Sequence, residues 1–356
     1  MREICWNRRS QLLGALVVAC AVVGAPVAQA DTAFFLAGTD PIPLIPPPQP
    51  THAQLAAVLG GRFSSDTLVN VNYPASVWPL TFDRPTMGRS IQIGAQMTED
   101  LLDTTVGPKT VAGWSQGAMV EDQVERDLTT DPNRPSASEV TFVLNGDPTR
   151  PGGLFSYLPA GTTIPVLNVT VSTPPESPYH TIVLVQQYDG AADFPDRPWN
   201  LLADANAVMG FLYLHVLPNG YRAIPATGGT TTTNDRGGTT TTYLLPTSHL
   251  PLTEPLRALG IPAAAVDRID ASLRPMVDAG YSRNDAAGDN RPHLTPYAGR
   301  RTDSAAGATK PAAGRSPTIA PDQHTAVAKT AGPTRHTADA TGGGTATFGT
   351  GRGGLR

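Results

Sequence analysis

The stretch Gly113-Trp114-Ser115-Gln116-Gly117 decides the fold of this 356-residue chain. It has the pattern Gly-x-Ser-x-Gly. Residues 109–112 before it are typical of a buried strand, and residues 118–124 after it are typical of a helix. Small residues on both sides of a serine permit a sharp strand-to-helix turn that exposes the serine Oγ. The pattern therefore predicts that Ser115 is a nucleophile and that the backbone N–H of Gln116 faces a developing oxyanion.

A nucleophile of this kind needs an acid and then a histidine further along the chain. Residues 181–188 are β-branched and apolar, which predicts a buried strand, and the loop after them contains Asp189 and Asp193. We favour Asp193 as the acid, because the Asp-Phe-Pro sequence that begins there is typical of the acid loop of many hydrolases. Asp189 is the alternative, since an aspartate at that place can instead cap the turn through its own backbone.

Seven histidines are present, and their order along the chain leaves three candidates for the base: His215, His249 and His293. We predict that His215 is the base, because the apolar segment 211–217 would hold its imidazole beside apolar walls. His249 is the alternate. The same segment is also compatible with a core histidine that has no catalytic role.

The first strand of the fold is expected to begin near Thr32 and to end in a tight turn at Gly38 and Thr39. Such a turn commonly supplies the second donor to an oxyanion. Thr39 could contribute its N–H, its hydroxyl or both, and Gly38 would permit the close approach.

Strand-like and helix-like segments alternate along the chain, which predicts an α/β fold with a doubly wound, mostly parallel sheet and flanking helices. Ligands bind such sheets at the carboxyl ends of the strands, where Ser115 and Asp193 are expected. Residues 226–242 are rich in Thr and Gly and predict a flexible surface hairpin. The remaining predicted elements are a helix at 87–102 and strands at 68–73, 110–112, 140–144 and 164–171.

The Gly-Trp-Ser-Gln-Gly-Ala motif and the Ala-Gly-Thr turn resemble those of the cutinase-like α/β-hydrolases, and further stretches resemble the PE-PPE domain, over about residues 31–290. The resemblance implies a triad of Ser115, Asp193 and His215 in an esterase, or in an acyltransferase that moves fatty acyl chains onto envelope glycolipids. The family's first turn usually has the pattern Gly-Gly-Thr-Gly, whereas this turn reads Ala37-Gly38-Thr39-Asp40. The departure that matters is Asp40, which brings a carboxylate near the expected oxyanion site. The further stretches are residues 71–75, 187–195, 250–257 and 273–281.

Composition divides the chain into three parts. Residues 1–30 have the form of a secretory signal peptide or an N-terminal anchor, residues 31–297 are the expected PE-PPE-like domain, and residues 298–356 are poor in large apolar side chains and expected to be disordered. Export to the medium or the cell envelope follows as an expectation. The net charge of −4 gives no support for nucleic-acid binding, and no cofactor motif or metal-ligand spacing is evident.

Three functions remain open. The first is a serine hydrolase that cleaves lipid or shorter acyl esters through an acyl-enzyme, and the second is an acyltransferase that passes the acyl group to an envelope glycolipid. The third is a non-catalytic envelope-binding protein on a hydrolase scaffold. Association with a membrane or the cell wall is compatible with all three. Residues 42–48 and 198–217 could wall an acyl cleft, although 198–217 could equally be a core helix.

Overall fold

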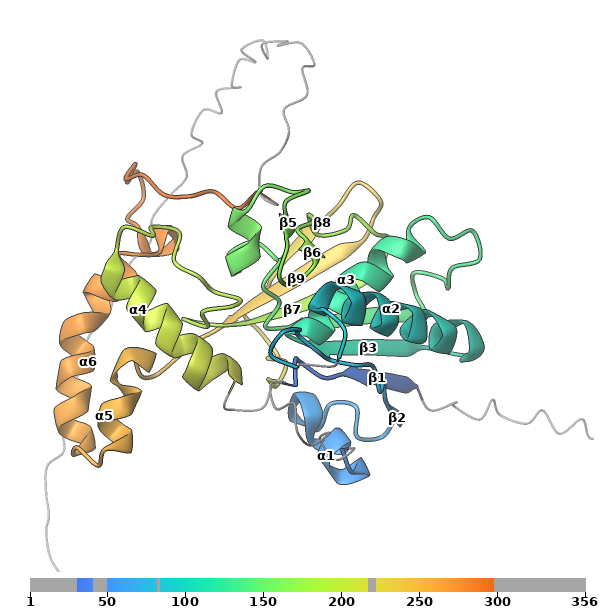
Figure 1. Ribbon diagram of the computed structural model, residues 1–356, viewed down its shortest axis with the longest axis horizontal. Helices are drawn as coiled ribbons and strands as arrows, with labels where there is room; N and C mark the ends of the chain where they lie inside the picture. The colour runs from blue at the N-terminus through green and yellow to red at the C-terminus, as the bar shows by residue number, and fades with distance from the viewer. Residues whose placement is uncertain (1–30, 41–49, 82–83, 217–221, 298–356) are drawn as a thin grey trace, which may run out of the picture. The chain divides into compact units, whose positions relative to one another are not determined.

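The computed structural model describes residues 31–40, 50–81, 84–216 and 222–297 (Figure 1). The expected leader at 1–30, the expected tail at 298–356 and the possible cleft wall at 42–48 lie outside the described residues. Among the described helices, none is both long enough and apolar enough to cross a membrane.

The described residues form a seven-stranded sheet in which every neighbouring pair of strands is parallel except the pair at one edge, β8 and β9. β2 follows β1 in the sequence and pairs with one edge of it, whereas the next strand, β3, pairs with the other edge. The order of strands therefore reverses between β1 and β3. Ligand sites of doubly wound sheets lie at such a reversal. The strands, in spatial order, are β2 (Thr67–Asn70), β1 (Thr32–Leu36), β3 (Lys109–Trp114), β4 (Val140–Asn145), β7 (His180–Gln186), β9 (Thr239–Leu245) and β8 (Thr230–Thr233).

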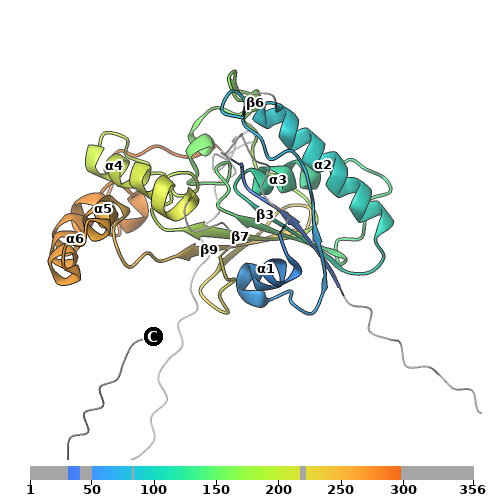
Figure 2. The same cartoon turned by 60° about the horizontal axis from the view of Figure 1, so that its bottom comes forward.

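Helices cover both faces of the sheet and extend beyond one end of it (Figures 1 and 2). Helix α1 (His52–Ala57) lies against one face, and α2 (Met87–Thr104) and α3 (Gln116–Leu128) lie against the other. Three further helices, α4 (Leu201–Gly210), α5 (Glu254–Ala258) and α6 (Ala263–Asp278), pack with one another. This arrangement confirms the predicted doubly wound α/β fold. Short helical turns are η1 (Val58–Gly61), η2 (Leu154–Tyr157), η3 (Phe211–Val216), η4 (Pro251–Thr253) and η5 (Ser282–Asn284).

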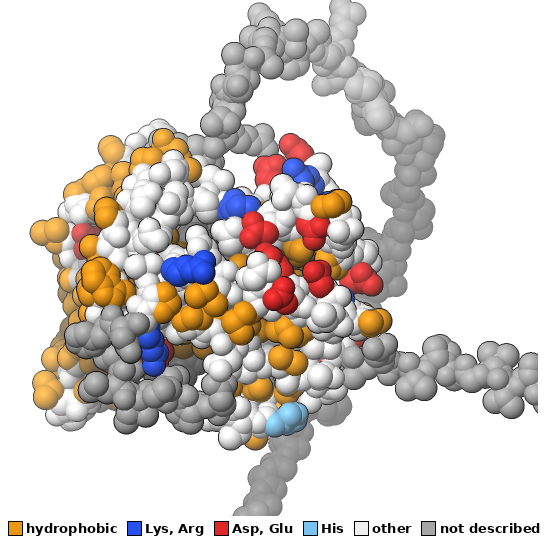
Figure 3. Space-filling model, turned by 45° about the vertical axis from the view of Figure 1, so that its right-hand side comes forward, with side chains coloured by type: hydrophobic (Ala, Val, Ile, Leu, Met, Phe, Trp, Pro, Cys, Tyr) orange, Lys and Arg blue, Asp and Glu red, His pale blue; other side chains and the backbone are white. Residues whose placement is uncertain are grey.

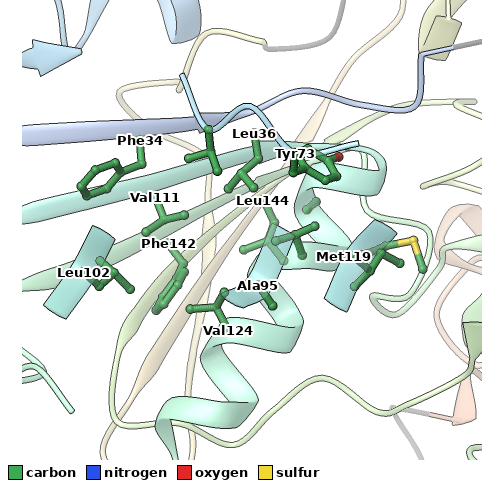
Figure 4. Close-up of a cluster of buried hydrophobic side chains, with 14 of the residues drawn as sticks. Phe34, Leu36, Tyr73, Ala95, Leu102, Val111, Met119, Val124, Phe142 and Leu144 are labelled. Carbon is green, nitrogen blue, oxygen red and sulfur yellow. The ribbon is translucent and has the colours of Figure 1, made fainter. Parts of the chain in front are cut away.

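Alternation along the strands divides the core between the two faces. In β1, Phe34 and Leu36 point to the side of α2 and α3, whereas Ala33 and Phe35 join the cluster on the side of α1. All of these side chains are at most 1% exposed. Figure 4 shows the larger cluster, in which aliphatic side chains of α2 and α3 pack over the strands. A strand buried on both faces explains why the sequence around residues 32–36 is continuously apolar.

Two sequence predictions about the sheet are corrected by the structure. Residues 164–171 do not form a strand of the large sheet; they contribute to β5 (Thr163–Ile164) and β6 (Val169–Thr170), a separate antiparallel pair that turns at Asn168, whose φ is 52°. The Thr-rich segment does form a hairpin, as expected, but β9 also pairs with β7 along its whole length. Its β-branched threonines suit a strand, which the Gly-rich flanks obscured.

The surface carries charges of both signs. On the face shown in Figure 3, acidic side chains gather over one region, the basic ones are few and separate, and hydrophobic side chains are concentrated toward the left-hand edge. The described residues of this face therefore form no continuous basic patch.

Candidate active site

The serine at the centre of the pentapeptide has a strained backbone. Ser115 lies between β3 and α3 with a φ of 55° and a ψ of −114°, in a region that non-glycine residues rarely adopt. Its backbone is held in place, because Ser115 N donates to Asn145 O at 2.8 Å and Ser115 O accepts from Met119 N at 3.2 Å. The strand-to-helix turn predicted from the sequence is therefore present, with Ser115 at its apex.

The two flanking glycines are required by close contacts. A Cβ at Gly117 would collide with the carbonyl of Leu36 at the end of β1, and a Cβ at Gly113 would collide with the backbone of Gly117. The turn can therefore fold back on itself and press against β1 only because both positions lack a side chain. This packing brings the first strand's exit loop beside Ser115, since a Cβ at Gly38 would lie 3.2 Å from the Ser115 Cβ.

A chain of two hydrogen bonds links Ser115 to a carboxylate. Ser115 Oγ lies 2.8 Å from His215 Nε2, and His215 Nδ1 lies 2.8 Å from Asp189 Oδ2. An ionised carboxylate can only accept, so Nδ1 carries the proton and Nε2 is left free to accept from the serine hydroxyl. His215 and Asp189 are both buried. The arrangement is that of a nucleophile, a base and an orienting acid.

The aspartate in this chain is Asp189, so the preference for Asp193 as the partner of His215 is corrected. The other carboxylate oxygen of Asp189 accepts from the backbone N–H groups of Ala191 and Ala192, at 2.8 and 3.4 Å. This capping of the turn was expected from the sequence, but as an alternative to a catalytic position. Asp189 has two carboxylate oxygens, and one caps the turn while the other meets the histidine.

Asp193 has a different set of partners. Both of its oxygens bind the guanidinium of Arg283, at 2.5 and 2.9 Å, and Oδ2 also accepts from Tyr188 N at 2.7 Å. Burial raises the pKa of the Asp193 carboxyl to about 6, although the Arg283 charge acts in the opposite direction. Asp193 therefore fastens the acid loop to the residues after α6. No local sequence signal connects positions 193 and 283, so this partner was missed.

Close backbone contacts set the distance between acid and base. A Cβ at Gly210, the last residue of α4, would collide with the carbonyl of Tyr188, and a Cβ at Gly190 would collide with the carbonyl of Ala207. The end of α4 thus lies directly on the acid loop. The π-helical turn η3 continues from α4 and carries His215 back over Asp189. These two glycines were not identified from the sequence.

Aromatic side chains surround the imidazole. The ring of Phe211 stacks on that of His215 with centroids 5.3 Å apart and planes 17° apart, and the Trp114 ring lies 6.1 Å away. The segment 198–217 was expected to be either a cleft wall or a core helix. Its described part packs one side into the core, and the cleft wall stays a prediction. Ala203, Ala207 and Gly210 are buried, whereas the opposite side of α4 and η3 exposes apolar residues: Leu201, Val208, Phe211 and Leu212.

The two expected oxyanion donors lie next to Ser115. Gln116 is the first residue of α3, where backbone N–H groups have no partner within the helix. Thr39 follows Gly38 in the loop after β1, and its Oγ1 accepts from Gln116 Nε2 at 3.2 Å. Asp40, the departure from the family pattern, forms an ion pair with Arg84 at 3.0 Å. That cation compensates the carboxylate charge near the loop.

The alternate histidine lies in a separate cluster. His249 Nδ1, Asp267 and Asp270 have ligand atoms within 4.8 Å of one another, a spacing that could hold a metal ion. The guanidinium of Arg257 already binds all three, at 2.9, 2.8 and 3.0 Å. This cation fills the role that a metal would have. His293 Nδ1, the third candidate, lies 3.0 Å from the carbonyl of Leu294 and is exposed.

A buried ionic cluster lies beneath the site. Arg150, after β4, binds Asp122 at 2.5 Å and Glu125 at 3.3 Å on α3. Desolvation, together with repulsion from Asp122, raises the pKa of Asp147 to about 8, and the nearby Arg150 acts against this rise. Asp147 follows Gly146, where an added Cβ would lie 3.2 Å from the His215 ring. The cluster therefore joins α3 to the loop that borders the histidine.

Comparison with known proteins identifies relatives that are named as acyltransferases and one that is named as an esterase. The SL1278 acyltransferase Chp1 of Mycobacterium tuberculosis is 36% identical over 289 residues, covering 78% of this chain and 71% of Chp1. The diacyltrehalose acyltransferase Chp2 of the same organism is 40% identical and the esterase PE16 is 37% identical, over 60% and 53% of this chain. The chain spans 66% of Chp2 and only 37% of PE16.

Among solved structures, a cutinase-like protein from Cryptococcus sp. is similar, with 18% identity, a TM-score of 0.29 and coverage of 47% of this chain and 82% of that one. The model of the PE-PPE domain matches residues 65–282, which include Ser115, Asp189 and His215. This match covers more than half of the sequence, and the chain therefore belongs to the PE-PPE domain family.

Proposed function

We propose that this chain is a serine esterase that cleaves carboxylic esters of lipids through an acyl-enzyme on Ser115. The observation that carries the proposal is the continuous chain of hydrogen bonds from Ser115 Oγ through His215 to Asp189, at 2.8 Å for each step. Its position at the carboxyl ends of parallel strands, beside the reversal of strand order, is the usual place for a ligand in this fold.

In the first half of the reaction, Ser115 Oγ attacks the acyl carbonyl carbon while His215 Nε2 takes the hydroxyl proton. Asp189 holds the imidazole by Nδ1 and stabilises the imidazolium that forms. The carbonyl oxygen becomes an oxyanion, for which the backbone N–H of Gln116 and Thr39 are the donors. When the carbon–oxygen bond to the alcohol breaks, His215 returns its proton to the departing alkoxide, and the acyl group stays on Ser115.

In the second half, an acceptor hydroxyl attacks the acyl carbon of the acyl-enzyme and gives its proton to His215. The bond between the acyl carbon and Ser115 Oγ then breaks, and His215 returns the proton to Ser115 Oγ, which restores the free enzyme. Water as acceptor releases a free acid, whereas a sugar hydroxyl gives an acylated glycolipid. The residues of the chain have the same roles in both cases. We favour hydrolysis in dilute buffer, since transfer needs an acceptor site that keeps water away from the acyl-enzyme.

The exposed apolar side chains support a lipid as the acyl donor. Val208 and Phe211 are 59% and 43% exposed on the helical segment that carries His215, so they could contact an acyl chain at little cost. Lipid or other acyl esters are also the substrates that the esterase and acyltransferase relatives imply. A glycolipid acceptor remains the second candidate, and the similarity to Chp1 and Chp2 favours it.

We also propose that the enzyme acts outside the cytoplasm, in the medium or at the envelope, which the leader-like composition of residues 1–30 supports. A purely binding role on the same scaffold is the least favoured interpretation, because a protein that only binds its ligand has no need for an aligned serine, imidazole and carboxylate.

The test is product analysis with purified protein and a lipid ester, with and without a glycolipid acceptor. Free fatty acid from the donor alone, lost in Ser115→Ala, supports the esterase. Acylated glycolipid without free fatty acid would replace it with the acyltransferase. Absence of both products, together with tight binding of the lipid, would favour the binding protein.

A further inference from the structure

The side chain of Gln116 forms a closed set of hydrogen bonds beside Ser115. It is only 1% exposed. Its Nε2 donates to Ser76 O at 3.0 Å and to Thr39 Oγ1 at 3.2 Å, and its Oε1 accepts from Ser90 Oγ at 2.9 Å. The carboxamide of Gln116 thus connects α3, α2 and the loop after β1.

The direction of each of these bonds follows from the chemistry of its partners. A backbone carbonyl can only accept, so the nitrogen of the Gln116 amide must be the atom that faces Ser76 O. Its second N–H then points to Thr39 Oγ1. Ser90 Oγ accepts from Ser76 N at 3.2 Å, which leaves its own proton for Gln116 Oε1. If the amide turned over, its oxygen would face the Ser76 carbonyl oxygen and that hydrogen bond would be lost.

The direction of the hydrogen bond from Gln116 constrains the hydroxyl of Thr39. Because Oγ1 accepts from Gln116, its proton is free to donate in another direction. The loop is also held at its neighbouring residues: Tyr73 Oη donates to Ala37 O at 2.5 Å, and Asp40 N donates to Ala75 O at 2.8 Å. The hydroxyl therefore has a fixed position next to the nucleophile before any substrate binds.

We propose that the Gln116 side chain is a positioning residue, which orients the Thr39 hydroxyl as a donor to the oxyanion. Gln116 thereby acts twice, directly through its backbone N–H and indirectly through its carboxamide. This inference rests on the proposed function. A donor fixed in advance stabilises the developing charge without a cost of reorganisation, so its effect should appear in kcat more than in KM.

The experiment measures kcat and KM for a soluble ester in single and double variants. Thr39→Val, which removes the hydroxyl, should lower kcat about 100-fold, and Thr39→Ser should recover most of it. Gln116→Ala keeps the backbone N–H and should lower kcat about 10- to 100-fold with little change in KM. Gln123→Ala is the matched control, since Gln123 lies on the same helix and its side chain donates to the exposed Asp127.

The decisive measurement is the double variant. If Gln116 acts through the Thr39 hydroxyl, Gln116→Ala added to Thr39→Val should lower kcat by less than about threefold further. Multiplication of the two single effects would overturn the proposal, as would a Thr39→Val enzyme with normal kcat. Thermal unfolding of each variant identifies losses that come from misfolding. If the wild-type protein shows no ester turnover that depends on Ser115, the proposed function is wrong, and this inference fails with it.

Discussion

The Nδ1 atom of His215 lies 2.8 Å from Oδ2 of Asp189, and Asp193, four residues further along, points its carboxylate to Arg283 instead. The two aspartates share one loop but have separate tasks. Asp189 orients the base, whereas Asp193 holds the backbone of Tyr188 and ties the loop to the residues after α6.

Substitution of the two aspartates should separate these tasks. Asp189→Asn can keep the shape of the loop but favours the wrong tautomer of His215, so kcat should fall roughly 10⁴-fold. Asp193→Asn leaves Arg283 without its anionic partner and should mainly lower the free energy of unfolding, by about 3 kcal/mol, with a smaller loss of kcat. Steady-state kinetics and denaturant unfolding of both variants test this, and the opposite ranking in kcat would return the acid to Asp193.

A fluorophosphonate probe should label Ser115. Among the serines that the structure describes, Ser115 is the one that hydrogen-bonds a histidine side chain, and its Oγ is made nucleophilic by that contact. Mass spectrometry of the labelled protein should find the adduct on the peptide that contains Ser115. Persistent labelling of a Ser115→Ala protein would show that another residue is the nucleophile.

Substitution of His215, the predicted base, and of His249, the alternate, should have very different effects on ester turnover. His215→Ala removes the acceptor of the Ser115 proton, so ester turnover should fall by several orders of magnitude. His249 is 45% exposed in its side chain and binds Arg257, so His249→Ala should change kcat/KM less than about twofold. An inactive His249 variant beside an active His215 variant would refute the assignment.

The sequence predicts this fold well because the central strands β1, β3, β4 and β7 are largely buried on both faces and are therefore rich in apolar residues. The turn at Ser115 could also be predicted from the sequence, because Gly113 and Gly117 are contacted by residues that are close in sequence or lie at the end of a predicted strand. The sequence could not decide between Asp189 and Asp193 as the partner of His215. It depends on Arg283, and a contact across 90 residues leaves no periodic or local pattern.

The Thr-rich strand and the π-helical turn show a second kind of limit. Residues 239–245 join the sheet because β7 offers an unpaired edge, which is a property of the folded sheet and not of the segment. Likewise, His215 reaches Asp189 because Gly210 permits α4 to lie on the acid loop. Contacts between elements of this kind determine which side chains meet in the site, and they exist only once the elements have packed together.

Gly210→Ala should disturb the site without touching a reacting group. An added Cβ would collide with the carbonyl of Tyr188, so α4 must move away from the acid loop and carry His215 with it. We expect a loss of roughly 1–3 kcal/mol in unfolding free energy and a fall in kcat of about 100-fold. Ala205→Ser, at an exposed position of the same helix, is the control. Unchanged kcat in Gly210→Ala would mean that the loop and helix can separate without affecting the histidine.

A carboxyl group is buried under the serine turn. Glu121 on α3 is fully buried, its Oε2 accepts from Val143 N at 3.1 Å, and its Oε1 has no hydrogen-bond partner among the described residues. Desolvation, reinforced by repulsion from Asp122, raises the pKa of the Glu121 carboxyl well above its usual value of 4.5.

A raised carboxyl pKa has a definite consequence for stability. Above about pH 4.5 the unfolded chain releases the Glu121 proton while the folded chain keeps it. The contribution of this group to the unfolding free energy therefore falls as pH rises, by at most about 1.4 kcal/mol per pH unit, until the folded protein also loses the proton. The substitution Glu121→Gln replaces the carboxyl by an amide that does not titrate and can still accept from Val143 N. The stability of Glu121→Gln relative to wild type should thus increase steadily from pH 5 to pH 8, as measured by urea unfolding at each pH. Glu176→Gln, at an exposed position, serves as the control and should stay parallel to wild type over that range. If the Glu121→Gln and wild-type curves are also parallel, Glu121 is ionised in the folded protein, and the charge beneath Ser115 must be compensated by a contact other than those described.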